Sequence, residues 1–203
     1  MLEGFKPLLN KVLHPCAALF AALRIHPNVL TVTGVLFFGA ATVLIAEGSW
    51  KIALILVITG SIIDGLDGVV ARDYGKKSSF GAVLDSTCDR ITELMWFGGI
   101  LAFYINNPLF SRARGNIYLA LIALGGSFMI SYVKARSEGA GISCRAGILQ
   151  RPERLILLCV FLFAGPDFMV WGLGFLAIMT WITVLQRIWR VFDEGRKLDS
   201  GQG

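Results

Sequence analysis

The most informative part of the chain reads Asp64-Gly65-Leu66-Asp67-Gly68, then Ala71-Arg72, and then Gly81, Asp85 and Asp89. Residues three or four apart share one face of a helix, so Asp64 and Asp67 should point the same way, as should Asp85 and Asp89. The twelve residues before the first pair, 52–63, carry no charge. We therefore expect the first pair near the end of a membrane helix, where ionised carboxylates need partners. Two facing acidic pairs indicate divalent cations, because hard cations prefer oxygen ligands.

A simpler interpretation is that these carboxylates form ion pairs with Arg72 and Arg90, or that they mark helix ends in water. The neighbouring glycines argue against it. Gly65, Gly68 and Gly81 have no side chain, so a second helix or a phosphate group can approach the backbone closely at these positions.

Composition indicates a membrane protein. Hydrophobic residues make up 55% of the 203 residues, mean hydropathy is +0.67 and charged residues amount to 16%, whereas soluble domains average about 25% charged residues. The net charge of +5 is expected from loops that face anionic lipid headgroups, so membrane lipids and not nucleic acid are the predicted partners.

The apolar pattern predicts an all-α integral membrane protein with six transmembrane helices and an N-terminal interfacial amphipathic helix. That first helix covers residues 1–24, where apolar residues recur every three to four positions; a soluble cap helix is the alternative. The catalytic transmembrane domain is expected over residues 25–192, followed by a cytoplasmic tail over 193–203. The six predicted spans are 25–46, 52–71, 80–105, 115–133, 151–164 and 168–186.

The order of these spans predicts where the acidic pairs lie. A short polar turn at 73–79 joins the second and third spans as an antiparallel hairpin, so the two acidic pairs face each other. Lys51, Arg112 and Arg114 fall on one side of the membrane, and nearly all other basic residues fall on the side of the acidic pairs. The positive-inside rule then predicts a multi-pass protein of the cell membrane whose acidic site faces the cytoplasm.

The run from Asp64 to Asp89 reads D-x2-D-G-x2-A-R-x8-G-x3-D-x3-D, and it resembles the signature of the CDP-alcohol phosphatidyltransferases. Members of that family join a CDP-activated lipid or alcohol to an acceptor hydroxyl and release CMP. The resemblance implies two metal ions, for which Mg²⁺ is the first expectation and Mn²⁺ the second. It also implies that Asp89 is the general base for the acceptor hydroxyl. The implied metal ligands are Asp64, Asp67, Asp85 and Asp89.

The same resemblance implies a binding site for the CDP-lipid. Gly68 would admit the nucleotide by close backbone approach, and Arg72 would bind phosphate through forked hydrogen bonds. An ordinary helix N-terminus explains the stretch Pro27–Thr31 equally well. The residues implied for CDP-lipid binding are Asn28, Val29, Leu30, Thr31, Gly68, Arg72 and Ser78.

A second basic set lies outside the signature, at the predicted cytoplasmic helix ends. Snorkelling and the positive-inside bias explain some of these residues. The fifth span, however, has only about ten apolar residues, which places its basic start below the headgroups, against a cavity. The segments that carry this set resemble those of phosphatidylinositol phosphate synthases, whose acceptor is inositol 1-phosphate. The predicted acceptor-phosphate ligands are Lys134, Arg136, Arg151, Arg154 and Arg187.

The resemblance therefore implies transfer of the phosphatidyl group of CDP-diacylglycerol to inositol 1-phosphate. A related enzyme could use glycerol 3-phosphate as acceptor or CDP-archaeol as donor. A cation transporter is a remote alternative. Transporter ion sites lie near the membrane midplane on broken helices, whereas these acidic residues are expected near one face of the membrane. The resemblance also implies a homodimer, for which small residues offer close helix contacts. These residues are Gly98, Gly99, Gly125 and Gly126.

Overall fold

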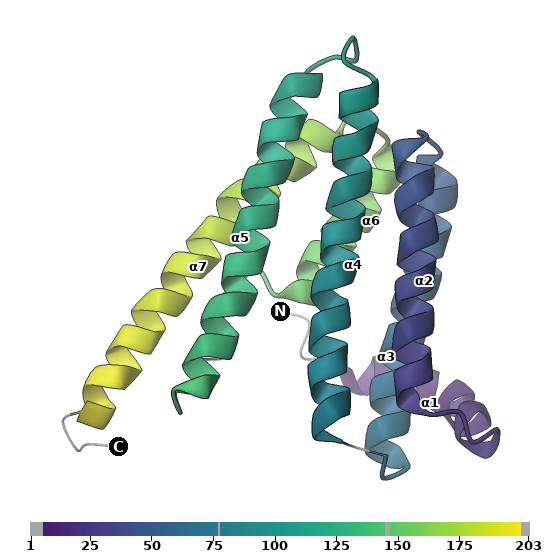
Figure 1. Ribbon diagram of the computed structural model, residues 1–203, viewed down its shortest axis with the longest axis vertical. Helices are drawn as coiled ribbons and strands as arrows, with labels where there is room; N and C mark the ends of the chain where they lie inside the picture. Colours follow the sequence, from purple (N-terminus) through teal and green to yellow (C-terminus); the bar gives the residue numbers. More distant parts are fainter. Residues whose placement is uncertain (1–5, 77, 145–146, 200–203) are drawn as a thin grey trace.

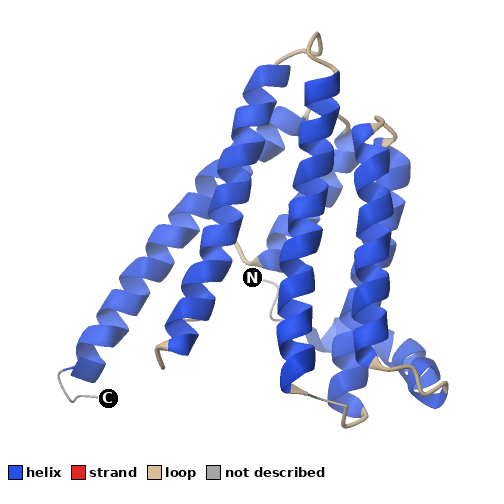
Figure 2. Cartoon of the chain, viewed as in Figure 1, coloured by secondary structure: helices blue, strands red, loops and turns tan. Residues whose placement is uncertain are grey.

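The computed structural model describes residues 6–76, 78–144 and 147–199, with side chains of the first helix from His14 onward. Residues 1–5 of the predicted first helix, 200–203 of the predicted tail, Lys77 and Arg145 lie outside this part. The described residues form seven helices and no strand (Figures 1 and 2), which confirms the all-α prediction. The helices are α1 (Lys6–Ala22), α2 (Pro27–Ala46), α3 (Trp50–Asp73), α4 (Ser79–Asn106), α5 (Ala113–Gly139), α6 (Arg151–Ala164) and α7 (Met169–Asp199).

Helix α2 forms the centre of the N-terminal half, because it packs along both α3 and α4. Its contact with α3 depends on two glycines: a Cβ added to Gly34 would lie 3.3 Å from the carbonyl oxygen of Gly60. A larger residue at either position would separate the two backbones. Phe38 of α2 and Phe97 of α4, both buried, belong to the apolar core above this contact. The close packing brings the start of α2 against the acidic end of α3.

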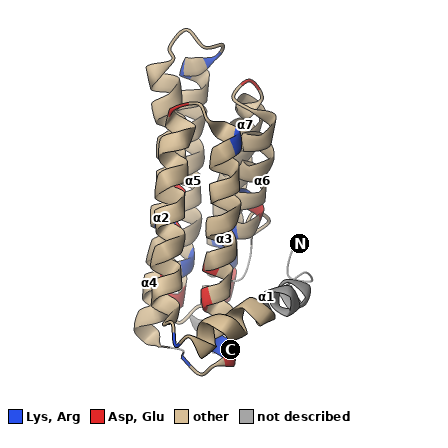
Figure 3. Cartoon of the chain, turned by 90° about the vertical axis from the view of Figure 1, so that its right-hand side faces the viewer, with Lys and Arg blue, Asp and Glu red and all other residues tan. Residues whose placement is uncertain are grey.

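The turn between α3 and α4 has the local structure that its sequence favours. Gly75 adopts a positive φ of 66°, in the left-handed region where glycine is favoured. Ser78 caps α4, and its hydroxyl accepts a hydrogen bond from the backbone N–H of Gly81 at 2.9 Å. The two helices therefore run antiparallel, as predicted, with their acidic residues at the same end of the molecule (Figure 3).

Helices α5, α6 and α7 form the C-terminal half. α5 packs along α7, and α6 packs against α3 and α7. Figure 1 shows that α6 begins partway along the bundle, so its first residues lie inside it and not at its end. Within the described residues, four helices have the length and apolarity to cross a membrane, namely α2, α3, α5 and α7. This supports an integral membrane protein; the count of six spans stays a prediction, because α6 has 14 residues and α4 carries charges along its first half.

Two ends of the chain add detail to the predicted boundaries. α1 lies across the lower end of the bundle (Figures 1 and 3), where Ala17 packs among the buried Leu30, Leu66 and Val69. An interfacial role for α1 remains a prediction.

α7 continues past the predicted end of the last span, so the first part of the predicted tail is helical. Ion pairs between residues four apart stabilise this extension: Arg190–Glu194 at 2.9 Å and Lys197–Asp193 at 3.1 Å.

Two of the four glycines predicted at a dimer contact pack inside the chain. A Cβ on Gly99 would lie 2.7 Å from the carbonyl oxygen of Thr42 in α2, and one on Gly126 would collide with Thr180 in α7. Gly98 has open space around it. The homodimer therefore stays a prediction, and Gly99 and Gly126 have a sufficient role in helix packing within one protomer.

Candidate active site

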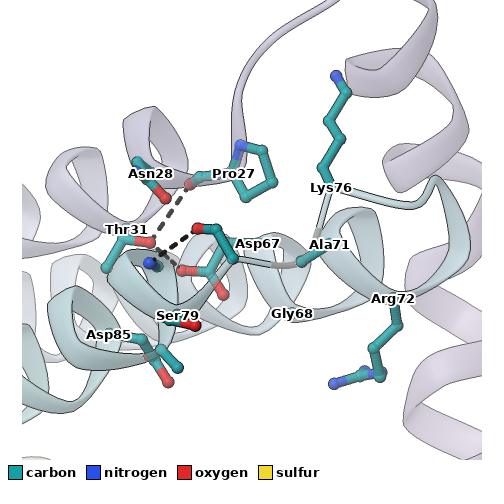
Figure 4. Close-up of a pocket in the computed structure, with 13 residues that line it drawn as sticks. Pro27, Asn28, Thr31, Asp67, Gly68, Ala71, Arg72, Lys76, Ser79 and Asp85 are labelled. Atoms are coloured by element: carbon teal, nitrogen blue, oxygen red, sulfur yellow. Dashed lines mark hydrogen bonds between the residues drawn. The ribbon is translucent and has the colours of Figure 1, made fainter.

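Three carboxylates from two helices converge near the lower end of the molecule. Asp64 and Asp67 belong to α3 and Asp85 to α4, and one oxygen from each lies within 4.8 Å of the other two. A third helix joins them, because the Thr31 hydroxyl of α2 donates a hydrogen bond to the Asp67 carboxylate (Figure 4). Clustered carboxylate oxygens suit a hard divalent cation, so these residues fit the predicted metal site.

Asp89 lies apart from this cluster of three carboxylates. It follows Asp85 by one helical turn, and its Oδ1 is 2.6 Å from a guanidinium nitrogen of Arg151 in α6. The same nitrogen donates to Asp64 at 2.9 Å. Arg151 thus bridges Asp64 and Asp89. The structure brings three of the four predicted metal ligands together and places the fourth beside the basic residues.

A cavity of about 530 Å³ opens beside the acidic cluster, between α2, α3 and the start of α4. We call it the hairpin cavity. Asn28 and Thr31, three residues apart, share the helix face that lines it, whereas Val29 is exposed and Leu30 packs into the apolar cluster with α1 and α3. The hairpin cavity is lined by Pro27, Asn28, Thr31, Asp67, Gly68, Ala71, Arg72, Lys76, Ser78, Ser79, Gly81, Ala82 and Asp85.

Two glycines line the hairpin cavity at positions where a side chain would crowd its other residues. A Cβ on Gly68 would lie 3.1 Å from the guanidinium of Arg72, and a Cβ on Gly81 would lie 3.3 Å from the side-chain oxygen of Asn28. Lys76, which sequence reasoning did not assign to the site, also lines the cavity, and its ammonium donates to the Ile25 carbonyl at 3.2 Å. Figure 4 shows Arg72 and Lys76 on the side of the cavity away from Asp85. The cavity thus has cations at one end and carboxylates at the other.

A second cavity, of about 350 Å³, lies between α4, α5, α6 and α7. We call it the basic cavity. Four of the five predicted acceptor ligands line it; the fifth, Arg136, is exposed on α5 and lines neither this cavity nor the hairpin cavity. Among the described residues, Asp85 is the one residue common to both linings. The basic cavity is lined by Asp85, Ser86, Asp89, Arg90, Glu93, Ile130, Ser131, Lys134, Gln150, Arg151, Pro152, Arg154 and Arg187.

The structure adds an acidic residue to this region that the sequence reasoning missed. Glu93 of α4 pairs with Arg154 of α6 through two hydrogen bonds, of 2.8 and 3.3 Å. A signal was present, because Glu93 continues the four-residue spacing of Asp85 and Asp89 along α4. Arg187 of α7 is also buried, and it donates to the Ile130 carbonyl of α5. Most cations of the basic cavity are therefore held by groups on other helices.

Comparison with known proteins is consistent with this site. The family model for CDP-alcohol phosphatidyltransferase matches residues 24–189. A phosphatidylinositol phosphate synthase of Corynebacterium glutamicum is 39% identical over 78% of this chain and 72% of its own length. An archaetidylinositol phosphate synthase of Methanothermobacter thermautotrophicus is 34% identical over 93% of this chain and 92% of its own.

Solved structures give the same result. The crystal structure of Mycobacterium tuberculosis phosphatidylinositol phosphate synthase with CDP-DAG bound superimposes with a TM-score of 0.80, at 33% identity, covering 90% of this chain and 94% of that one. The same enzyme in complex with manganese and citrate gives a TM-score of 0.78 at 34% identity, covering 88% of each chain.

Proposed function

The chain belongs to the CDP-alcohol phosphatidyltransferase family, and we propose that it transfers the phosphatidyl group of CDP-diacylglycerol to inositol 1-phosphate and releases CMP. One observation carries the proposal: the hairpin cavity and the basic cavity meet at Asp85. A transferase of this kind needs two binding sites that share one reacting phosphate. The catalytic unit we propose is the helical part over residues 25–192.

The donor would occupy the hairpin cavity. Arg72 and Lys76 supply two positive charges for the diphosphate, and Gly68 allows the backbone to approach it. Asn28 and Thr31 line the α2 side, where the nucleotide would lie. The relative with CDP-DAG bound supports this choice, since its fold matches over most of both chains. Val29 and Leu30 would contribute to the site through their place in α2 and not through direct contact.

Divalent cations would be held by the acidic residues between the two cavities. Asp64, Asp67 and Asp85 offer oxygens close enough to share an ion, and Asp89 is the proposed ligand that completes the set on the side of the basic cavity. When bound, such ions withdraw charge from the phosphate and from the leaving CMP. The relative in complex with manganese supports a divalent metal; we propose two ions and Mg²⁺ as the physiological choice.

The acceptor would occupy the basic cavity. Lys134, Arg151 and Arg187 come from three different helices and surround a space that suits a phosphorylated small alcohol. Asp89 lies in the same cavity, where its carboxylate could take the proton of the attacking hydroxyl. Arg136, exposed on α5, would act on the acceptor only at long range.

Both the bacterial and the archaeal relatives have inositol phosphate in their names, and they differ in the lipid, which supports this acceptor more strongly than glycerol 3-phosphate. The archaeal relative keeps CDP-archaeol open as a second donor.

We further propose that the acidic end of the bundle faces the cytoplasm. Lys51, Arg112 and Arg114 lie at or near the opposite helix ends, so most of the positive charge is on the proposed cytoplasmic side.

The test is CMP release by the purified protein, with two donors and three acceptors. CDP-diacylglycerol with inositol 1-phosphate should give the highest kcat/KM, free inositol should be poor, and glycerol 3-phosphate should be intermediate or poor. If free inositol reacts as well as its phosphate, or if glycerol 3-phosphate reacts best, the proposed acceptor is wrong. Faster turnover with CDP-archaeol would change only the donor.

A further inference from the structure

Glu93 and Arg154 form a buried ion pair that the proposed chemistry does not use. Nε of Arg154 is 2.8 Å from one carboxylate oxygen of Glu93, and its Nη2 is 3.3 Å from the other. Arg154 is 3% exposed and Glu93 is 4% exposed. Apolar side chains could fill such a site with a smaller desolvation penalty, so burial alone does not account for the pair.

The third nitrogen of Arg154 extends the pair to another helix. Nη1 of Arg154 donates to the carbonyl of Leu149 at 3.3 Å, and the backbone N–H of Leu149 donates to the Thr183 hydroxyl, also at 3.3 Å. A continuous chain of hydrogen bonds therefore runs from Glu93 on α4, through Arg154 on α6 and the segment before it, to α7. These three helices supply most of the charged residues of the basic cavity.

Arg154 also lies on the same face of α6 as Arg151, since the two are three residues apart. On α4, Asp89 and Glu93 are four apart and likewise share a face. The two helices are thus joined by two parallel ion pairs: Arg151–Asp89 at 2.6 Å and Arg154–Glu93 at 2.8 Å. The first joins the proposed general base to a proposed acceptor ligand, and the second lies one helical turn further along both helices. α6 packs its backbone mainly on α3 and α7, and these long side chains add a link to α4.

We propose that Glu93 is a positioning residue for acceptor binding. It holds Arg154, which fixes the start of α6, and so it places the guanidinium of Arg151 between Asp64 and the basic cavity. Because both of its forked nitrogens and the third nitrogen are engaged, Arg154 serves to position α6. The proposed ligands of the acceptor phosphate are then Lys134, Arg151 and Arg187. This inference rests on the proposed function, because it assumes that the acceptor binds in the basic cavity.

The experiment is a comparison of KM values for donor and acceptor in Glu93→Gln, with inositol 1-phosphate and CDP-diacylglycerol as the substrates. Glutamine keeps the length of the side chain and loses the charge that orients Arg154. Displacing the charge-assisted contact of Arg151 with the acceptor phosphate should weaken binding roughly tenfold to hundredfold, so the KM for inositol 1-phosphate should rise tenfold or more. The KM for CDP-diacylglycerol should change by less than twofold, because the hairpin cavity does not include Glu93.

A second variant and a matched control make the result specific. Arg154→Lys keeps the charge but cannot reach both oxygens of Glu93 and the Leu149 carbonyl together, so it should show the same KM pattern. In the double variant the two effects should not add, because both act through one interaction. Glu194→Gln is the control: Glu194 also pairs with an arginine, Arg190, at 2.9 Å, on the partly exposed extension of α7. Both KM values should be unchanged in it.

Three results with Glu93→Gln would contradict the inference. An unchanged acceptor KM in Glu93→Gln, or an equal rise in both KM values, would mean that the pair is only structural. A lower acceptor KM would mean that Arg154, once released, binds the phosphate itself. If Glu93→Gln does not fold, the ratio of KM values in Arg154→Lys decides the question. If the wild-type protein uses no phosphorylated acceptor, the proposed function fails as well; a normal Glu93→Gln beside an active wild type removes only the role of Glu93.

Discussion

Asp85→Asn should separate the stability of the protein from its activity. Asp85 lines both cavities and belongs to the cluster of three carboxylates, whose oxygens lie within 4.8 Å of one another. Two unit charges at that distance repel by at least about 3.5 kcal/mol at an effective dielectric constant of about 20. Asp85 takes part in two such pairs, and Arg151 offsets part of the repulsion through Asp64. Without divalent cations, the amide should therefore stabilise the fold, by roughly 1–3 kcal/mol.

Divalent cations should reverse the order of stability. A cation present at 100 times its Kd stabilises the wild type by about 2.7 kcal/mol, whereas the variant lacks one of the three clustered carboxylates and should gain little. CMP release by the variant should fall by roughly 10³-fold or more. The reacting phosphate of the CDP-lipid would lose the cation that stabilises the charge developing on it and on the leaving CMP.

The assay combines CMP release with thermal unfolding in detergent, with Mg²⁺, with Mn²⁺ and with excess chelator. Asp193→Asn serves as the control, because it removes a carboxylate from an exposed ion pair with Lys197, far along α7. Near-normal turnover in Asp85→Asn, or full wild-type activity in excess chelator, would refute the metal site. A variant that is no more stable than the wild type in excess chelator would refute the electrostatic argument. One that Mg²⁺ stabilises as strongly as the wild type would refute the role of Asp85 as a metal ligand.

Three further predictions follow from particular residues. Asp89→Asn should retain CDP-diacylglycerol binding better than Asp64→Asn and lose comparable turnover, because Asp64 belongs to the cluster of three carboxylates beside the hairpin cavity, whereas Asp89 lies outside that cluster and lines the basic cavity; equal loss of donor binding, measured by titration, would contradict the division of roles. Gly99→Ala should destabilise the fold by about 1–3 kcal/mol through contact with the Thr42 carbonyl, while Gly98→Ala, in open space, should be neutral in the same unfolding assay. In mild detergent, native mass spectrometry should show a dimer of the 22.1 kDa chain; an active species of monomer mass would remove the homodimer.

The sequence was sufficient for the helices because their limits are marked by charge, proline and glycine. Pro27 begins α2 and Pro152 lies in the first turn of α6, where a missing N–H costs nothing. The end of α7 was not predictable in this way. The uncharged run ends at Gln186 and arginines follow it, yet the helix continues to Asp199. The ion pair between Arg190 and Glu194 stabilises this part, and hydropathy does not detect such contacts.

The candidate site was predictable where helical spacing decides it. Asn28 and Thr31 are three apart and line one cavity, and the same geometry turns Val29 and Leu30 away from it, so a contiguous motif overstates the number of contacting side chains. Glu93 could not be assigned from sequence, because its role depends on Arg154, which lies 61 residues later in the chain. A partner at that separation is fixed by tertiary packing alone.

The arrangement of the two cavities has a consequence for the reaction that we propose. The nucleotide would lie toward Thr31 on one side of Asp85, and the acceptor hydroxyl would lie toward Asp89 on the other. Attack from the basic cavity would then reach the phosphorus opposite the departing CMP, as an in-line displacement requires. The position of Asp85 between the cavities is therefore as important to the proposed mechanism as its charge.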